Sequence, residues 1–149
     1  MPEDLWKFAL DLYARPGVET ACLAAQTAGA NVCLLLCAAW LGSLRSPWSR
    51  ARQAQLQALA DEHEQTFIAP LRALRMAWRA AAGHDPATAR LREGVKRLEL
   101  DAERMLCARL EACCRGWLDE AARASAPAWL EQLEHAAALR QLLEGPAPD

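Results

Sequence analysis

Strand-forming residues are scarce in this chain. Its 149 residues include one isoleucine, three valines, two phenylalanines and one tyrosine, whereas alanine, leucine, arginine and glutamate are abundant. β-Branched and aromatic residues favour strands, and the abundant types favour helices. This composition excludes an all-β fold and predicts an all-α one.

An excess of positive charge is also lacking. The chain carries 17 lysines and arginines against 19 aspartates and glutamates, a formal net charge of −2. Domains whose main partner is a nucleic-acid backbone usually carry a strong basic excess. There is therefore no strong nucleic-acid signal, and any basic surface has to be local.

The N-terminus lacks the apolar run of a secretory signal. Its first eleven residues already contain Glu3, Asp4, Lys7 and Asp11, which does not fit a signal peptide. Six cysteines without such a signal indicate reduced thiols rather than a disulfide framework. We therefore expect a cytoplasmic protein.

Motifs for catalysis and cofactor binding are missing as well. There is no glycine-rich phosphate loop, Gly-x-Ser-x-Gly elbow or paired-carboxylate motif. Cys33 and Cys37 lie one helical turn apart in an apolar run, which is not zinc-finger spacing. The Glu-x-x-His motif of di-iron bundles is absent at His63 and His135. We predict no metal, no cofactor and no catalytic residue; an enzyme would have to use His63, which lies on an apolar stripe, or a cysteine.

One segment, Thr20 to Leu44, lacks charge altogether and is long enough to cross a bilayer. It contains Gln26, Thr27 and Asn31, however, and its strongly apolar part is only the short run 32–41. This pattern favours a buried core helix, preceded by a break near Gly29, over the alternative of a membrane segment.

The helical pattern is punctuated by proline and glycine. We expect one domain, a bundle of five or six helices over residues 1–149, divided into N-terminal helices (1–44), a long antiparallel hairpin (47–124), a C-terminal helix (127–144) and a frayed tail (145–149). The turn of the hairpin lies at residues 83–86, and Pro70 should kink its first half. The predicted inner stripe of its second half is Leu91, Val95, Leu98, Met105 or Leu106, Leu110, Cys113 and Trp117.

Arginine and tryptophan, which are enriched at protein interfaces, form the remaining pattern. Arginines follow helical spacing at 72, 75 and 79 and heptad spacing at 90, 97 and 104, and there are six tryptophans. The arginine stripes could bind an anion, a phosphate backbone or an acidic partner, or form a solvated face balanced by nearby carboxylates. The tryptophans could supply contacts or pack in the core.

The first 44 residues also carry a recognisable pattern: Leu5-Trp6, Phe8, Leu10, Tyr13, Pro16-Gly17-Val18, Cys22-Leu23, Gln26, Gly29-Ala30, Val32 and Leu34-Leu35-Leu36 through Trp40. This resembles a family of small gamma-proteobacterial proteins, as in pseudomonads, known as a domain of unknown function. Family members often have Asp-Val-Asn where this chain has Asn31-Val32-Cys33. The resemblance implies no activity, substrate or cofactor.

These observations favour a non-catalytic cytosolic helical interaction or adaptor module, either a homodimer or a partner of another cytosolic protein. The alternative is a binder of a hydrophobic small molecule or lipid in an interhelical pocket, and an enzyme is the weakest of the three. The residues we expect to contact a ligand or partner are Trp6, Tyr13, Gln26, Asn31, His63, Arg72, Arg75 and Arg79.

Overall fold

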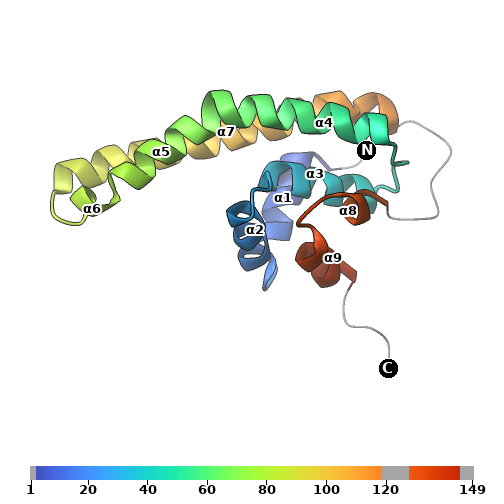
Figure 1. Cartoon of the computed structure of the whole chain (residues 1–149), viewed down its shortest axis with the longest axis horizontal. Helices are drawn as coiled ribbons and strands as arrows, with labels where there is room; N and C mark the ends of the chain where they lie inside the picture. The colour runs from blue at the N-terminus through green and yellow to red at the C-terminus, as the bar shows by residue number, and fades with distance from the viewer. Residues whose placement is uncertain (1–2, 119–127, 145–149) are drawn as a thin grey trace.

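A long helical hairpin runs the length of the molecule in the computed structural model, which describes residues 3–118 and 128–144 (Figure 1). Its first half comprises α4 (Arg50–His63), a π-helical turn η1 (Glu64–Ile68), α5 (Ala69–Ala77) and α6 (Arg79–Ala82), and the return is the single helix α7 (Pro86–Leu118). The turn lies where the sequence predicts it. Residues 119–124 of the expected hairpin lie outside the described residues.

Capping residues explain where the two long helices begin. The Asp85 carboxylate accepts hydrogen bonds from the Ala87 N–H at 3.1 Å and from the Thr88 hydroxyl at 2.7 Å, which fixes the start of α7. The Ser49 hydroxyl accepts a hydrogen bond from the Arg52 N–H at 3.1 Å. Helix α4 therefore begins at Arg50, a little later than the predicted start of the hairpin.

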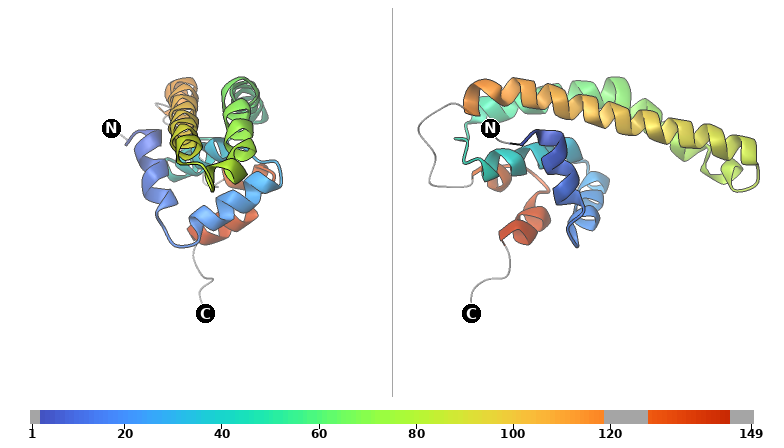
Figure 2. Two further views of the ribbon diagram at one scale, coloured as in Figure 1. Left: turned by 90° about the vertical axis from the view of Figure 1, so that its left-hand side faces the viewer. Right: turned by 180° about the vertical axis from the view of Figure 1, so that it is seen from behind.

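The other helices form what we call the head: α1 (Leu5–Tyr13), α2 (Val18–Thr27), α3 (Val32–Ser43), α8 (Ala128–Gln132) and α9 (Ala137–Glu144). The head packs on α4 and the C-terminal half of α7, and the rest of the hairpin extends beyond it (Figures 1 and 2). We call this extension, residues 69–98, the arm. The described residues are all-α, with no strand among them, as the composition predicts.

Helix α3 lies at the centre of the head. Every residue from Cys33 to Leu41 is buried, so α3 has no polar face, as its charge-free sequence predicts. The break before it is also where we expected it: Gly29 has φ +105°, and the Asn31 side chain caps the helix by accepting from the Leu34 N–H at 3.0 Å. No helix of the described residues has the length and apolarity needed to cross a membrane.

Most of the tryptophans stabilise the interior rather than forming a surface. All six lie in the described part of the chain, and each is buried or half-buried. Trp40 donates its Nε1–H to the Glu3 carbonyl at 3.1 Å, and Trp129 donates to the Ser46 carbonyl at 2.9 Å. Five of the six therefore pack in the main hydrophobic core, whereas Trp78 is a half-buried residue of the arm.

The described residues form more helices than the five or six predicted. The C-terminal helix expected over 127–144 is interrupted between α8 and α9, where His135 adopts φ +64°. Pro70 is accompanied by the π-helical turn rather than by a simple kink. Residues 145–149, predicted to fray, lie outside the described residues.

The predicted inner stripe of α7 is only partly correct. Val95, Leu106 and Leu110 are buried, but Leu91 and Leu98 are 61% and 55% exposed. These two leucines belong to the arm, where the head no longer covers the hairpin. Amphipathic spacing identifies a helix face, but it does not say whether another element covers that face.

Candidate functional site

The arm leaves unusually much apolar surface uncovered. No residue of α5 or α6 is buried, although the apolar residues of α5 are concentrated on one side of the helix. Four large apolar side chains of the arm are exposed: Leu74, Met76, Leu91 and Leu98. Exposed apolar side chains gathered on one segment are common at interaction sites.

The arm is also strongly basic. Residues 69–98 contain seven arginines and lysines and two acidic residues, a formal net charge of +5, in a chain whose total is −2. Arg79, Arg90 and Arg97 are exposed, and in the described part of the chain none of them forms an ion pair. A local field of this sign attracts acidic partners.

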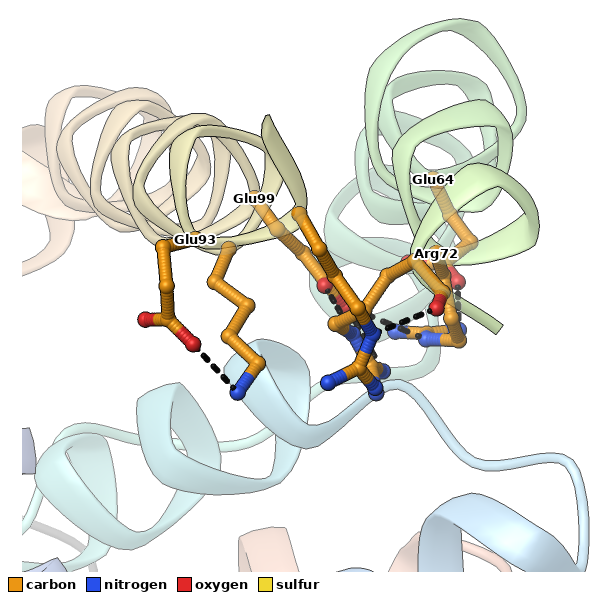
Figure 3. Close-up of polar contacts among 7 residues, drawn as sticks. Glu64, Arg72, Glu93 and Glu99 are labelled. Carbon is orange, nitrogen blue, oxygen red and sulfur yellow. Dashed lines mark hydrogen bonds and ion pairs between the residues drawn. The ribbon is translucent and has the colours of Figure 1, made fainter. Parts of the chain in front are cut away.

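Two of the predicted arginines pair with carboxylates at the root of the arm, where Figure 3 shows Arg72 directed toward Glu64. Arg72 lies 2.7 Å from Glu64 and 3.5 Å from Glu99. Arg75 forms two hydrogen bonds to Glu99, from Nε at 2.6 Å and from Nη2 at 3.2 Å. The buried Glu99 thus joins α5 to α7, and both guanidinium groups are used in ion pairs within the fold.

A cavity of about 270 Å³ lies beside this cluster, between the arm root and the head. It brings together six residues that the sequence indicated separately: Trp6, Tyr13, Gln26, Asn31, Arg72 and Arg75. They come from α1, α2, the residue before α3, and α5. His63 and Arg79 do not line this cavity.

The amides of the cavity have different roles. With its oxygen toward the guanidinium group, the Gln26 side chain accepts from Nη2 and Nε of Arg72 at 2.5 and 3.2 Å. The Asn31 oxygen is used to cap α3. Its Nδ2 atom is buried, and no hydrogen-bond partner for it exists among the described residues. Asn31 thus leaves one donor unsatisfied at the cavity.

The aromatic residues of the cavity are partly covered. The Arg104 guanidinium carbon lies 5.6 Å from the centre of the Trp6 ring, a cation–π arrangement. Burial, and then the charges of Cys22, Glu19 and Glu103, raise the pKa of the Tyr13 phenol. The Tyr13 phenol is therefore uncharged at neutral pH.

Glu103 is the carboxyl group of the cavity that lacks a counterion. In the part of the chain that the structure describes, its side chain forms no hydrogen bond or ion pair. Burial is the main cause that raises its pKa, followed by repulsion from Glu99, and Arg72 opposes the shift. No cluster of three or more potential metal ligands exists among the described residues.

His63 is a hydrogen-bonded core residue. Its side chain is 2% exposed, its Nε2 lies 2.8 Å from the Ala102 carbonyl and its Nδ1 lies 3.1 Å from Nη1 of Arg109. Because Arg109 can only donate, Nδ1 accepts and Nε2–H donates to the carbonyl. Both ring nitrogens are therefore occupied.

The cysteines are free thiols, and all but the half-buried Cys113 are buried. Burial raises the pKa of Cys22 to about 11. Hydrogen bonding to Cys114, 3.9 Å away, and burial raise the pKa of Cys37. Thiols in such surroundings are poor nucleophiles.

The three carboxylates that line the cavity, Glu64, Glu99 and Glu103, were not predicted from the sequence. Glu99 had a usable signal, because it follows Val95 by four residues and precedes Ala102 by three, which places a carboxylate on the inner face of α7. A buried carboxylate needs cationic partners. Nothing in the local sequence, however, indicates that Glu103 would lack one.

Comparison with known proteins gives one match. Residues 4–110 match a family described as "Protein of unknown function (DUF2390)". No curated protein matches, and neither does any solved structure. The family match extends well beyond the 44 N-terminal residues that carry the predicted resemblance, into the arm and most of α7. Since it covers more than two thirds of the chain, this protein belongs to the DUF2390 family of proteins of unknown function.

Proposed function

We propose that this protein is a non-catalytic cytosolic interaction module whose arm binds an acidic, amphipathic helix of a partner protein. The observation that carries this proposal is the uncovered arm: α5 and α6 bury no residue, and Leu74, Met76, Leu91 and Leu98 are exposed. A two-helix hairpin can accept one more helix along an exposed apolar face, in the manner of helix-in-groove complexes.

Charge supports an acidic partner. The arm has a formal net charge of +5, and Arg79, Arg90 and Arg97 are exposed. An acidic helix would place carboxylates beside these arginines and apolar side chains over the leucines. Such complementarity accelerates association and selects the partner.

The apolar component favours a protein over a nucleic acid. Phosphate contacts require cations but not exposed leucines, and the arm presents both. The non-catalytic part of the proposal rests on His63, whose ring nitrogens are both occupied, and on the buried thiols. The free thiols also fit a reducing compartment.

The test uses a labelled synthetic peptide that places leucines at three-and-four spacing and glutamates elsewhere. Its comparator has the same composition with the leucines scattered around the helix. Fluorescence anisotropy with the full chain should show binding of the first peptide only, weakening as salt is raised. The double variant Leu91→Ser/Leu98→Ser should bind about tenfold more weakly, a loss of about 1.4 kcal/mol.

The matched control is Leu142→Ser, which alters a leucine of similar exposure on α9 of the head and should bind as the wild type does. Three results would overturn the proposal. They are no peptide binding, tighter binding to single-stranded RNA or anionic vesicles than to the peptide, and a dimer in light scattering whose arms exclude the peptide. The last result would mean that a second copy of this chain, rather than an acidic helix, covers the arm.

A further inference from the structure

We propose that the cavity at the root of the arm binds a small organic cation with an apolar portion, of the alkylamine class, whose ammonium group lies against the Glu103 carboxylate. This site is separate from the exposed face of the arm and goes beyond the interaction function. It also differs from the hydrophobic or lipid pocket expected from sequence, because its lining is charged.

The size and walls of the cavity fit such a ligand. A volume of about 270 Å³ is at the lower end for small-molecule pockets. Its apolar walls come from the head and from α7, and they include Trp6, Leu10, Leu23, Leu36 and Leu100. A short alkyl chain would be covered by these side chains, and a long acyl chain would not fit.

The charged residues that line the cavity favour a cationic ligand over an anionic one. Three carboxylates, Glu64, Glu99 and Glu103, and two guanidinium groups, Arg72 and Arg75, line the cavity. Both arginines already pair with Glu64 or Glu99. An anion would have to displace Glu64 or Glu99 from the arginines, and the unpaired Glu103 would repel it. A cation would instead supply the counterion that Glu103 lacks.

The unpaired carboxylate can be reached from the cavity. Glu103 lines the cavity and has no hydrogen-bond partner among the described residues, and its oxygens are not among their buried, unpartnered side-chain atoms. The Asn31 Nδ2, in contrast, is closed off from the cavity by its burial. An ammonium group in the cavity would give the Glu103 carboxylate a charged hydrogen-bond donor.

The cavity opens toward the arm along α7. A neighbouring groove is lined by Arg75, Lys96, Glu99, Leu100 and Glu103, four of which also line the cavity. Glu103 and Leu100 therefore lie where the cavity meets the groove. This provides a route by which a small amine can reach the carboxylate.

Isothermal titration with hexylamine, hexanol and hexanoate tests the proposal, because these probes share an apolar chain and differ in the charge of the head group. We expect saturable binding of one hexylammonium per chain, much weaker binding of hexanol and none of hexanoate. Glu103→Gln removes the charge with little change of shape and should weaken hexylammonium binding about tenfold. Glu93→Gln, on the exposed side of α7, should leave binding unchanged.

A second variant, Leu23→Trp, retains every charge and adds bulk at the wall of the cavity. It should also weaken binding, which protects the test against a folding defect in the first variant. Equal binding of hexylammonium and hexanol, preferred binding of hexanoate, wild-type affinity in Glu103→Gln, or no binding of any probe would each overturn the proposal. Peptide binding by the arm is independent of all four results.

Discussion

The Nη1 atom of Arg72 lies 2.7 Å from the Oε1 atom of Glu64, although the two residues are eight positions apart. At 3.6 residues per turn, such residues would point about 80° apart on a regular α-helix. The π-helical turn adds one residue between them, and the Ala69 N–H donates to the Glu64 carbonyl, five positions back. The pair therefore occupies positions like those of residues seven apart, on one helix face.

The π-helical turn thus shapes the root of the arm. Pro70 directly follows Ala69, and a proline within a regular helix lacks a donor and crowds the carbonyl four residues earlier. A wider turn relieves this crowding, and in this chain it also directs Glu64 to the cavity. π-Helical turns of this kind are frequent at functional sites.

Removing Glu99 should destabilise the fold because it would leave Arg72 and Arg75 without their shared carboxylate. We expect Glu99→Ala to lower the free energy of unfolding by about 2 kcal/mol, since the cluster is only partly buried. Urea denaturation measures this change. Glu93→Ala, which breaks an exposed pair with Lys96, should lower the free energy of unfolding by less than about 0.5 kcal/mol. An equal loss of stability in the two variants would contradict a stabilising role of Glu99.

Replacing Glu103, in contrast to Glu99, should stabilise the fold. Burial and the Glu99 charge raise the pKa of Glu103 above the ordinary 4.5, so the carboxyl group is easier to ionise in the unfolded chain. Its contribution to stability is complete below 4.5 and is lost as the pH rises through the higher folded-state pKa. Glu103→Gln should therefore be more stable than the wild type near neutral pH, by about 1 kcal/mol, and the difference should shrink in acid.

Urea denaturation at several pH values checks the Glu103 prediction. A variant less stable than the wild type at neutral pH would mean that Glu103 has a counterion in solution. That result would also weaken the case for an amine site.

His63→Ala should act on stability rather than on binding. It removes hydrogen bonds to the Ala102 carbonyl and from Arg109 and leaves a buried space. We expect a loss of about 3 kcal/mol in the free energy of unfolding. Peptide and hexylammonium affinities should not change in the folded variant. Wild-type stability combined with weaker binding of the peptide or of hexylammonium would show that His63 has a role in ligand binding.

Thiol labelling should separate Cys113 from the other cysteines. With Ellman's reagent, the folded protein should react first at the half-buried Cys113, and slowly at neutral pH because burial raises its pKa. Peptide mapping by mass spectrometry identifies the labelled residue. Fast labelling of Cys22 or Cys37 in the folded chain would contradict the buried arrangement.

The sequence predicts the centre of the fold well. The charge-free run that becomes α3, the break near Gly29 and the turn at residues 83–86 all depend on local chemistry, namely apolar content, capping and backbone freedom. Prediction failed where the outcome depends on distant elements. Leu91 and Leu98 follow helical spacing, but the head ends before it covers them.

The candidate site was predictable only in fragments. Trp6, Gln26 and Arg72 come from separate parts of the chain, and only the tertiary packing places them at one cavity. The inward turn of Arg72 depends on the π-helical turn, for which Pro70 is the sole local signal. Composition averaged over the chain also hid the basic arm, because acidic residues elsewhere reduce the net charge to −2.

The most direct test of the proposed interaction function is to locate the surface to which the acidic helical peptide binds. Amide hydrogen exchange of the full chain should be measured with and without the peptide. We expect added protection within residues 69–98, on α5, α6 and the first part of α7, and unchanged exchange in α1–α3. Protection confined to the head, or no change at a saturating peptide concentration, would contradict it.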